Sequence, residues 1–310
     1  MMKKIIFIFV SIFILISDIN LKGQNNESVC IPKENGNIIL AYKGFETFLN
    51  SEKTWNDYNE DVLGGFPTLA SIHHRYIHDG LIDSTLYPKE ISDFTMDTYK
   101  PYFDRIDEAQ IVNIYDSVIK SMNQLLPPQG AVDICFFLPY GKDCFVQDVS
   151  GKKTVFISIK YDIDEMDYIL IHEYAHCLHH TRRPEEPSVL KRWIISEGIA
   201  SVFPVLLSEN RTIYDGLWMM PKENVDWCIQ NEQQIMDSIY VDLDKNSDEI
   251  GRKYIAGGEG FSTPPKGFPE KTGYYIGFRM IEKCLNSGIS VAELCSLSST
   301  AVMKESGMFN

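Results

Sequence analysis

The chain has 310 residues, and its 43 acidic and 29 basic residues give a formal net charge of −14 at pH 7. A surface this acidic disfavours nucleic acids and anionic membranes as partners, although net charge carries no information about the fold. The length is sufficient for one large domain or for two lobes with a sizeable core.

The first residues predict a signal peptide over residues 1–23. Lys3 and Lys4 give the start of the chain a positive charge, and Ile5 to Ile16 is an apolar run that is too short for a comfortable membrane span. We expect cleavage after Gly23 and export to the periplasm or the extracellular space, with no stable membrane insertion afterwards. An uncleaved membrane anchor is the alternative.

Residues 24–105 predict a mostly helical N-terminal region, which forms either one wall of a substrate cleft or a separate lobe. Within it, Ile38 to Leu49 predicts a helix. Residues 106–310 are interpreted as a second domain. Its first helix ends before Pro127 and Pro128 and carries an apolar stripe at helical spacing, made of Ile111, Ile114, Val118, Met122 and Leu125.

Two strands are expected after this helix. Val132 to Leu138 and Lys152 to Lys160 are rich in β-branched and aromatic residues, which favours strands. Cys135 and Cys144 flank a turn, where they either bridge a hairpin by a disulfide or remain buried thiols. The chain contains seven cysteines, so at least one of them is unpaired.

The His-Glu-x-x-His motif at residues 172–176 is the most informative feature for function. A helix predicted from about Asp164 to His180 places His172 and His176 on one face, where both imidazoles can reach one Zn²⁺. Glu173 follows the first histidine and is placed to take a proton from a metal-bound water. The motif therefore predicts a catalytic zinc site with a glutamate as general base.

Catalytic zinc usually takes three protein ligands, and Glu197 is the candidate for the third. It is the only acidic residue between Glu186 and Glu209, and it lies in an apolar helix predicted over Ser188 to Leu207, where an unpaired carboxylate would be costly. Gly198 inside this helix indicates the close approach of another backbone, which we expect to be the zinc helix. The alternative interpretation is an exposed glutamate on an amphipathic helix.

Together these motifs resemble the gluzincin class of zinc metallopeptidases. The His-Glu-x-x-His motif is followed by Glu-Gly-x-Ala at residues 197–200 and by Gly-Tyr-x-x-Gly at residues 273–277, a combination most similar to a bacterial family of predicted Zn-dependent proteases. The resemblance covers about residues 132–285. It implies an α+β fold with a thermolysin-like catalytic core, in which a small mixed sheet packs on the zinc helix and the remainder is mostly helical.

The resemblance also implies the roles of individual residues. His172, His176 and Glu197 would hold one zinc ion, and Glu173 would be the general base. One departure concerns Ser201, because thermolysin-type enzymes place an aspartate at this position to orient the first histidine. The chain also lacks the Gly-x-Met-Glu-Asn element with which gluzincin aminopeptidases capture a substrate N-terminus, which argues against a dedicated aminopeptidase.

A hydrolytic site also requires a hydrogen-bond donor for the developing oxyanion. Tyr274 is the first candidate and Tyr275 the second, both on a helix predicted from Gly273 to Leu285 after a loop rich in glycine and proline. The alternative is that both tyrosines are half-buried helix aromatics. His179 is either an assistant in catalysis or a dipole partner at the end of its helix.

Residues 242–253 imitate the front of an EF-hand calcium loop. Ser247 occupies the position where the sharp turn requires glycine, and Lys253 the position of the bidentate glutamate. We therefore expect no calcium site in this segment.

The sequence as a whole predicts an exported zinc metallopeptidase whose partners are peptide or protein substrates. Water bound to zinc would be deprotonated by Glu173 and would attack a peptide carbonyl polarised by the metal. An edge strand, Thr154 to Lys160, would align the substrate backbone by strand addition. Two alternatives are a metal-holding binding or assembly protein without useful turnover, and a zinc hydrolase that acts on a non-peptide amide.

Overall fold

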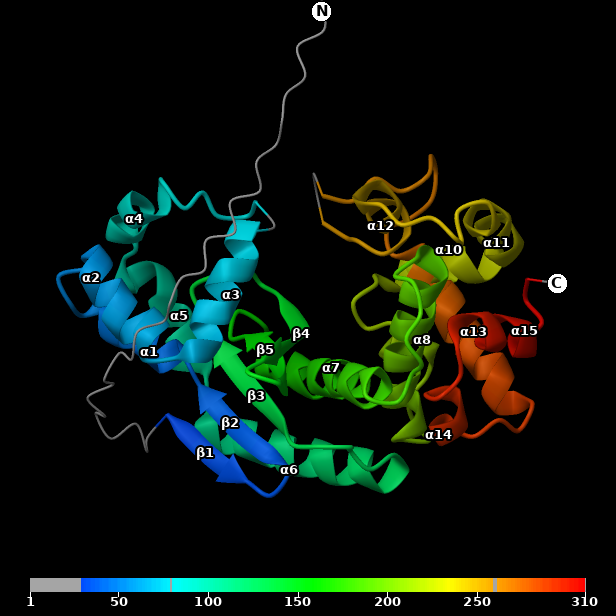
Figure 1. The fold of residues 1–310 in the computed structure, drawn as a ribbon, viewed down its shortest axis with the longest axis horizontal. Coiled ribbons are helices and arrows are strands. Elements are labelled where there is room, and N and C mark those ends of the chain that lie inside the picture. The colour runs from blue at the N-terminus through cyan, green and yellow to red at the C-terminus, as the bar shows by residue number, and fades with distance from the viewer. Residues whose placement is uncertain (1–28, 79, 259–260, 310) are drawn as a thin grey trace, which may run out of the picture.

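The computed structural model describes residues 29–78, 80–258 and 261–309. The segment interpreted as a signal peptide, residues 1–23, lies outside these ranges. In Figure 1 the sheet and helix α7 lie in the middle of the molecule, helices α1–α5 lie on one side, and helices α8 and α10–α15 lie on the other. The fold is α+β, as the sequence predicts.

The N-terminal part of the described chain contributes two strands and a series of helices. Short irregular helices at Tyr58–Gly64 and Ile91–Asp93 interrupt this series. The elements are β1 (Cys30–Lys33), β2 (Gly36–Leu40), α1 (Tyr42–Leu49), α2 (Trp55–Asp57), α3 (Pro67–His78), α4 (Tyr87–Glu90), α5 (Met96–Arg105) and α6 (Glu108–Leu125).

The remaining elements complete the sheet and build the helical side that follows it. They are β3 (Val132–Phe137), β4 (Cys144–Val149), β5 (Lys152–Ser158), α7 (Met166–His180), α8 (Leu190–Leu206), α9 (Ile213–Gly216), α10 (Lys222–Gln230), α11 (Glu232–Tyr240), α12 (Asp248–Tyr254), α13 (Thr272–Asn286), α14 (Val291–Leu294) and α15 (Ser299–Ser306).

The sheet is mixed, with the strand order β1-β2-β3-β5-β4. Strands β2, β3 and β5 run parallel to one another, while β1 and β4 are antiparallel edge strands. Strand β3 is buried along its whole length, because it pairs on both sides. The prediction that Thr154 to Lys160 forms an edge strand was wrong, since β5 lies between β3 and β4, and β4 is the edge on that side.

The same strand order excludes the predicted cysteine hairpin. Cys135 lies on β3 and Cys144 on β4, and β5 separates these two strands. All seven cysteines are free thiols in the structure. The disulfide alternative was therefore wrong, because the turn after β3 does not return the chain beside β3.

The helix predicted from Ile38 to Leu49 was wrong in its first turn. Ile38 and Leu40 belong to β2, where they pair with Ile134 and Phe136 of β3. Burial alternates along β2 with the period of a strand, and α1 begins only at Tyr42. The sheet thus joins strands from the N-terminal region to strands of the later part of the chain.

Helix α7 begins after a capped turn and crosses the interior. The side chains of Asp162 and Glu165 complete a capping box with the backbone of the turn Ile163–Glu165, and α7 continues from Met166. The helix packs against β4, β5, α6 and α8, and it is buried from Ile169 to His179. Its polar residues therefore lie inside the protein. In the described part of the chain, no helix has the length and apolar character needed to cross a membrane.

Candidate metal centre

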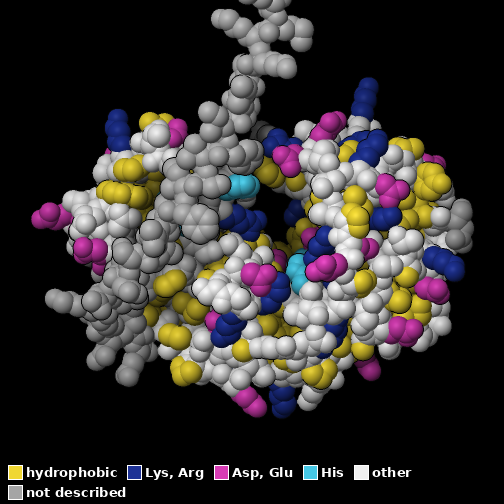
Figure 2. Space-filling view, in the orientation of Figure 1, with side chains coloured by type: hydrophobic (Ala, Val, Ile, Leu, Met, Phe, Trp, Pro, Cys, Tyr) yellow, Lys and Arg dark blue, Asp and Glu magenta, His cyan; other side chains and the backbone are white. Residues whose placement is uncertain are grey.

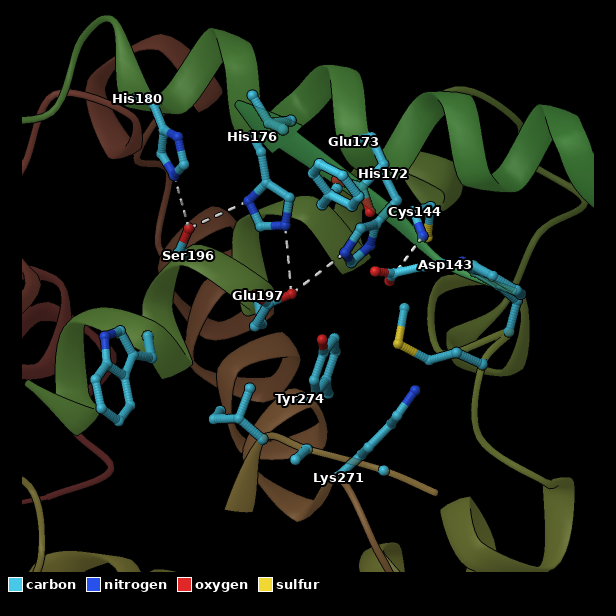
Figure 3. Close-up of a pocket in the computed structure, with 18 of the residues that line it drawn as sticks. Asp143, Cys144, His172, Glu173, His176, His180, Ser196, Glu197, Lys271 and Tyr274 are labelled. Atoms are coloured by element: carbon cyan, nitrogen blue, oxygen red, sulfur yellow. Dashed lines mark hydrogen bonds and ion pairs between the residues drawn. The ribbon is translucent and has the colours of Figure 1, made fainter. Parts of the chain in front are cut away.

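Three side chains from two packed helices converge on one point. His172 and His176 lie on α7, and Glu197 lies on α8. The Glu197 Oε2 atom lies 3.3 Å from Nε2 of His172 and 3.3 Å from Nε2 of His176, and one ligand atom from each residue lies within 4.8 Å of the other two. Figure 3 shows the two imidazoles directed at Glu197 from the same side. The structure thus brings together the three residues that the sequence nominates as ligands.

The geometry of this cluster fits a zinc ion. Two His nitrogens and one carboxylate oxygen are a recurrent ligand set of catalytic zinc, and tetrahedral ligands about 2.0–2.1 Å from the metal are separated by roughly 3.3 Å. The two N···O distances in the cluster are both 3.3 Å. His172 and His176 are buried, and Glu197 is largely buried, so the ligands are withdrawn from bulk water.

The carboxylate of Glu197 and the imidazole of His176 favour each other's charged form. Burial alone would raise the pKa of Glu197, but the adjacent His176 and His172 outweigh it and lower the pKa. Burial would likewise lower the pKa of His176, while the carboxylates of Glu197 and Glu173 raise it. Glu197 is therefore ionised, which is the form of a carboxylate that binds metal, whereas His176 would have to release its proton to a bound metal.

Among the described residues, Nδ1 of His176 has a hydrogen-bond partner, whereas Nδ1 of His172 has none. Nδ1 of His176 lies 3.2 Å from Oγ of Ser196, and that oxygen also lies 3.4 Å from Nε2 of His180. With Nε2 of His176 bound to a metal, Nδ1 would carry the hydrogen and donate a hydrogen bond to Oγ of Ser196. Nδ1 of His172 and Oγ of Ser201 are buried and have no hydrogen-bond partner among the described residues. The departure at Ser201 thus leaves the first histidine without the usual carboxylate.

Glu173 lies beside the cluster without joining it. Its side chain is 5% exposed and lines the same cavity as the three ligands. Burial raises the pKa of Glu173, and the neighbouring His176 and His172 oppose this shift. The Cys144 thiol on β4 interacts with the Glu173 carboxylate, and burial raises the pKa of this thiol. A buried carboxylate next to the ligands is in position to exchange a proton with a molecule bound there.

The two candidate tyrosines have different surroundings. Figure 3 shows the Tyr274 hydroxyl directed at Glu197, and the Tyr274 ring stacks on His172 with centroids 6.2 Å apart. Burial and the carboxylates of Glu197 and Glu173 raise the pKa of Tyr274, so its hydroxyl stays protonated and can donate. The Tyr275 hydroxyl donates instead to Glu232 at 2.7 Å. Of the two, Tyr274 is the one that the structure places at the metal centre.

His179 lies outside the cavity. It is buried at the end of α7, and burial and the nearby Arg183 lower its pKa to about 3. Its neighbour His180 lines the cavity, and burial, His176 and Arg183 lower the pKa of His180 to about 2. The sequence indicated His179, which does not line the cavity, and gave no signal for its neighbour His180, which does.

A cavity of about 650 Å³ opens above the metal centre. One wall is the edge strand β4, which contributes Cys144, Phe145 and Val146. Figure 2 shows a hollow on this face of the molecule, with Lys, Arg and His side chains around it. Several lining residues were not predicted from the sequence, because they come from separate elements and carry no shared motif: Asp143, His180, Arg183, Arg192, Trp193, Ser196, Trp218 and Lys271.

Comparison with known proteins agrees with this geometry. The family model described as "Predicted Zn-dependent protease (DUF2268)" matches residues 144–304, which is more than half of the chain. The matched segment runs from β4 to α15 and contains the three converging residues, Glu173 and Tyr274. No curated protein and no solved structure matches the chain.

Proposed function

This chain belongs to the family of predicted Zn-dependent proteases, and on that basis we propose that it is a zinc metallopeptidase that binds one zinc ion per chain. The observation that carries the proposal is the convergence of His172, His176 and Glu197 beside the buried carboxylate of Glu173. Three protein ligands with an adjacent general base form the minimal equipment of this class of hydrolase.

The chain's own residues have distinct roles in this proposal. Zinc held at the cluster would supply a Lewis acid for activating water and polarising the substrate carbonyl. Glu173 accepts the proton of the attacking water and delivers it to the leaving amine. The Tyr274 hydroxyl donates a hydrogen bond to the oxygen that gains negative charge.

Strand β4 is the element that would align the substrate. Among the described strands it pairs only with β5, and its residues Cys144 to Val146 line the cavity. An extended peptide can add to the free edge of a strand through backbone hydrogen bonds that do not depend on its sequence. The strand that would align the substrate backbone is therefore β4, which lies next to Glu173, and not Thr154 to Lys160.

The proposal is tested by incubating the purified protein with a broad peptide library and identifying the products by mass spectrometry. Cleavage should disappear after chelation and return when zinc is added. Glu197→Ala should lower zinc affinity, because it removes one of three ligands. A protein that binds zinc but cleaves no peptide would be a metal-holding binding protein, or a hydrolase of another amide, and would contradict the proposal.

A further inference from the structure

Two arginines line the cavity at the end where α7 passes into α8. Arg183 follows the last turn of α7, and its backbone N–H donates to the His179 carbonyl at 2.9 Å. Arg192 lies in the first turn of α8 and donates through Nη1 to the Glu186 carbonyl at 2.8 Å. Both side chains line the cavity together with His180, and both are partly buried. The chain thus holds two guanidinium groups beside the metal centre.

No carboxylate of the described residues contacts either guanidinium. Within the described ranges, Arg183 and Arg192 form no ion pair. Burial and the positive charge of Arg192 lower the pKa of Arg183 to about 10, and Glu186 only partly opposes them. The Glu186 carboxylate is engaged elsewhere, since it accepts hydrogen bonds from N and Oγ of Ser299 at 3.1 Å and 2.7 Å.

Arg183 and Arg192 differ from the other described arginines because they line the cavity; Arg182 and Arg252 likewise form no ion pair among the described residues, but they lie outside it. The chain has a formal net charge of −14, so acidic partners are abundant. The cation at the other end of the cavity, Lys271, experiences the charges of Glu197, Glu270 and Asp143. Three other arginines are paired with carboxylates: Arg105 with Asp162, Arg211 with Asp167, and Arg279 with Glu232. Within the described part of the chain, Arg183 and Arg192 have no such partner, so a bound anion would stabilise their two positive charges.

We propose that Arg183 and Arg192 bind a carboxylate of the substrate while its peptide bond lies at the metal centre. A guanidinium group matches a carboxylate through two parallel hydrogen bonds, which fixes both position and charge. Zinc held at the cluster would offset the charges of Glu173 and Glu197, so these carboxylates would not repel an acidic group of the substrate from the cavity. The carboxylate belongs either to an acidic side chain or to the free C-terminus of a peptide. This inference rests on the proposed function, because it names the substrate class of the same site.

The test uses the zinc-loaded Glu173→Gln variant, so that bound peptides are not consumed. Fluorescence anisotropy compares labelled peptides in two matched pairs. One pair differs only by a C-terminal carboxylate or amide, and the other only by Asp or Asn at a single position. We expect the charged member of at least one pair to bind about 10–100-fold more tightly, as a charge-assisted hydrogen bond allows. The pair that discriminates identifies the source of the carboxylate.

Matched substitutions assign the effect to the two arginines. Arg183→Gln and Arg192→Gln should each reduce the ratio of affinities within the discriminating pair to a few-fold. Arg192→Lys keeps the charge and should retain most of the ratio. Lys304→Gln removes a positive charge from an exposed position on α15 and should leave the ratio unchanged. Zinc content and circular dichroism of each variant confirm that it is folded.

The failure of this inference is distinguishable from failure of the proposed function. If neither pair discriminates, or if both Gln variants keep the full ratio, the carboxylate site is refuted, even when the wild-type protein cleaves peptides. If the charged peptides bind through Arg183 and Arg192 but the wild-type protein cleaves no peptide, the carboxylate site stands and the peptidase proposal fails.

Discussion

Gly198 on α8 and Gly277 on α13 are in direct backbone contact. A Cβ atom added to Gly198 would lie 2.2 Å from the carbonyl carbon of Gly277, and one added to Gly277 would lie 2.2 Å from the carbonyl oxygen of Ile194. Both distances are far shorter than any allowed contact. The contact explains the glycines of the Glu-Gly-x-Ala and Gly-Tyr-x-x-Gly motifs, and it corrects the expectation that Gly198 packs on the zinc helix.

This contact positions two elements of the metal centre at once. Glu197 directly precedes Gly198, and Tyr274 lies one turn before Gly277. We expect Gly277→Ala to lower the free energy of unfolding by about 1–3 kcal/mol or more, because the added methyl group has no space. It should also weaken zinc binding by shifting α13 away from α8. Urea denaturation and a competitive zinc titration measure the two effects.

Gly130→Ala is the matched control for this substitution. A Cβ atom at Gly130 would meet nothing within 4 Å, so stability should change by less than about 0.5 kcal/mol. Equal effects of the two substitutions would mean that the contact between α8 and α13 is not tightly packed.

The helix α7 and the convergence of three candidate ligands were predictable because their signals are local. The spacing of His172 and His176 and the isolation of Glu197 in an apolar stretch indicated the three converging residues before any tertiary information. Sheet order was not predictable in this way. A strand pattern reports burial of a segment but not its neighbours, so the position of β5 between β3 and β4 could not be inferred from Thr154 to Ser158 alone.

The rest of the cavity depends on tertiary packing. Arg183, Arg192 and Lys271 come from the end of α7, the start of α8 and the start of α13. No spacing in the sequence connects them, and a lone arginine near a helix end is usually a solvated residue. Similarly, Gly198 indicated a close backbone contact. Its partner, Gly277, is set by the packing of α13 on α8, which no local pattern predicts.

Tyr274→Phe tests the proposed oxyanion donor. Loss of one donor to a developing oxyanion should lower kcat by about 10–10³-fold while substrate affinity changes little. Tyr275→Phe is the control, because the Tyr275 hydroxyl donates to Glu232 and lies outside the cavity. Steady-state kinetics on one cleaved peptide compare the variants. If the Tyr275 variant lost as much activity as the Tyr274 variant, the role assigned to Tyr274 would be wrong.

The buried carboxylate of Asp242 contributes to the free energy of unfolding in a way that depends on pH. Its carboxylate is 2% exposed and accepts hydrogen bonds from Lys245, Lys253 and Tyr254. Burial would raise its pKa, but these partners lower it to about 2. Because the folded pKa lies below the unfolded value, the carboxylate stabilises the fold above about pH 4, and this stabilisation is lost as the pH falls toward 2.

Asp242→Asn should therefore lower the free energy of unfolding by about 2 kcal/mol at pH 7, and the difference from wild type should shrink below pH 4. Asp244→Asn is a nearby control, since the Asp244 side chain is 82% exposed and its pairing with Lys191 should contribute less than about 1 kcal/mol. Urea denaturation of the three proteins across this pH range measures both effects. A difference that stays constant down to pH 2 would contradict the ionic account of Asp242.

We propose that the chain is exported with removal of its first residues, which lie outside the described ranges. Lys3, Lys4 and the apolar run from Ile5 to Ile16 carry this proposal. N-terminal sequencing of protein from a host with a secretory pathway should begin between about Gly23 and Glu27. An intact Met1 in a soluble cytoplasmic fraction would refute it.

The most direct test of the account compares zinc content and turnover in the same sample of Glu173→Gln. Glu173 is not one of the three converging ligands, so the variant should retain about one zinc per chain and near-native stability. It lacks the general base, so its kcat on a cleaved peptide should fall by at least about 10²–10⁴-fold. Full zinc content with that loss is the predicted result. Full zinc content with near wild-type turnover would contradict the assignment of Glu173 as the catalytic base.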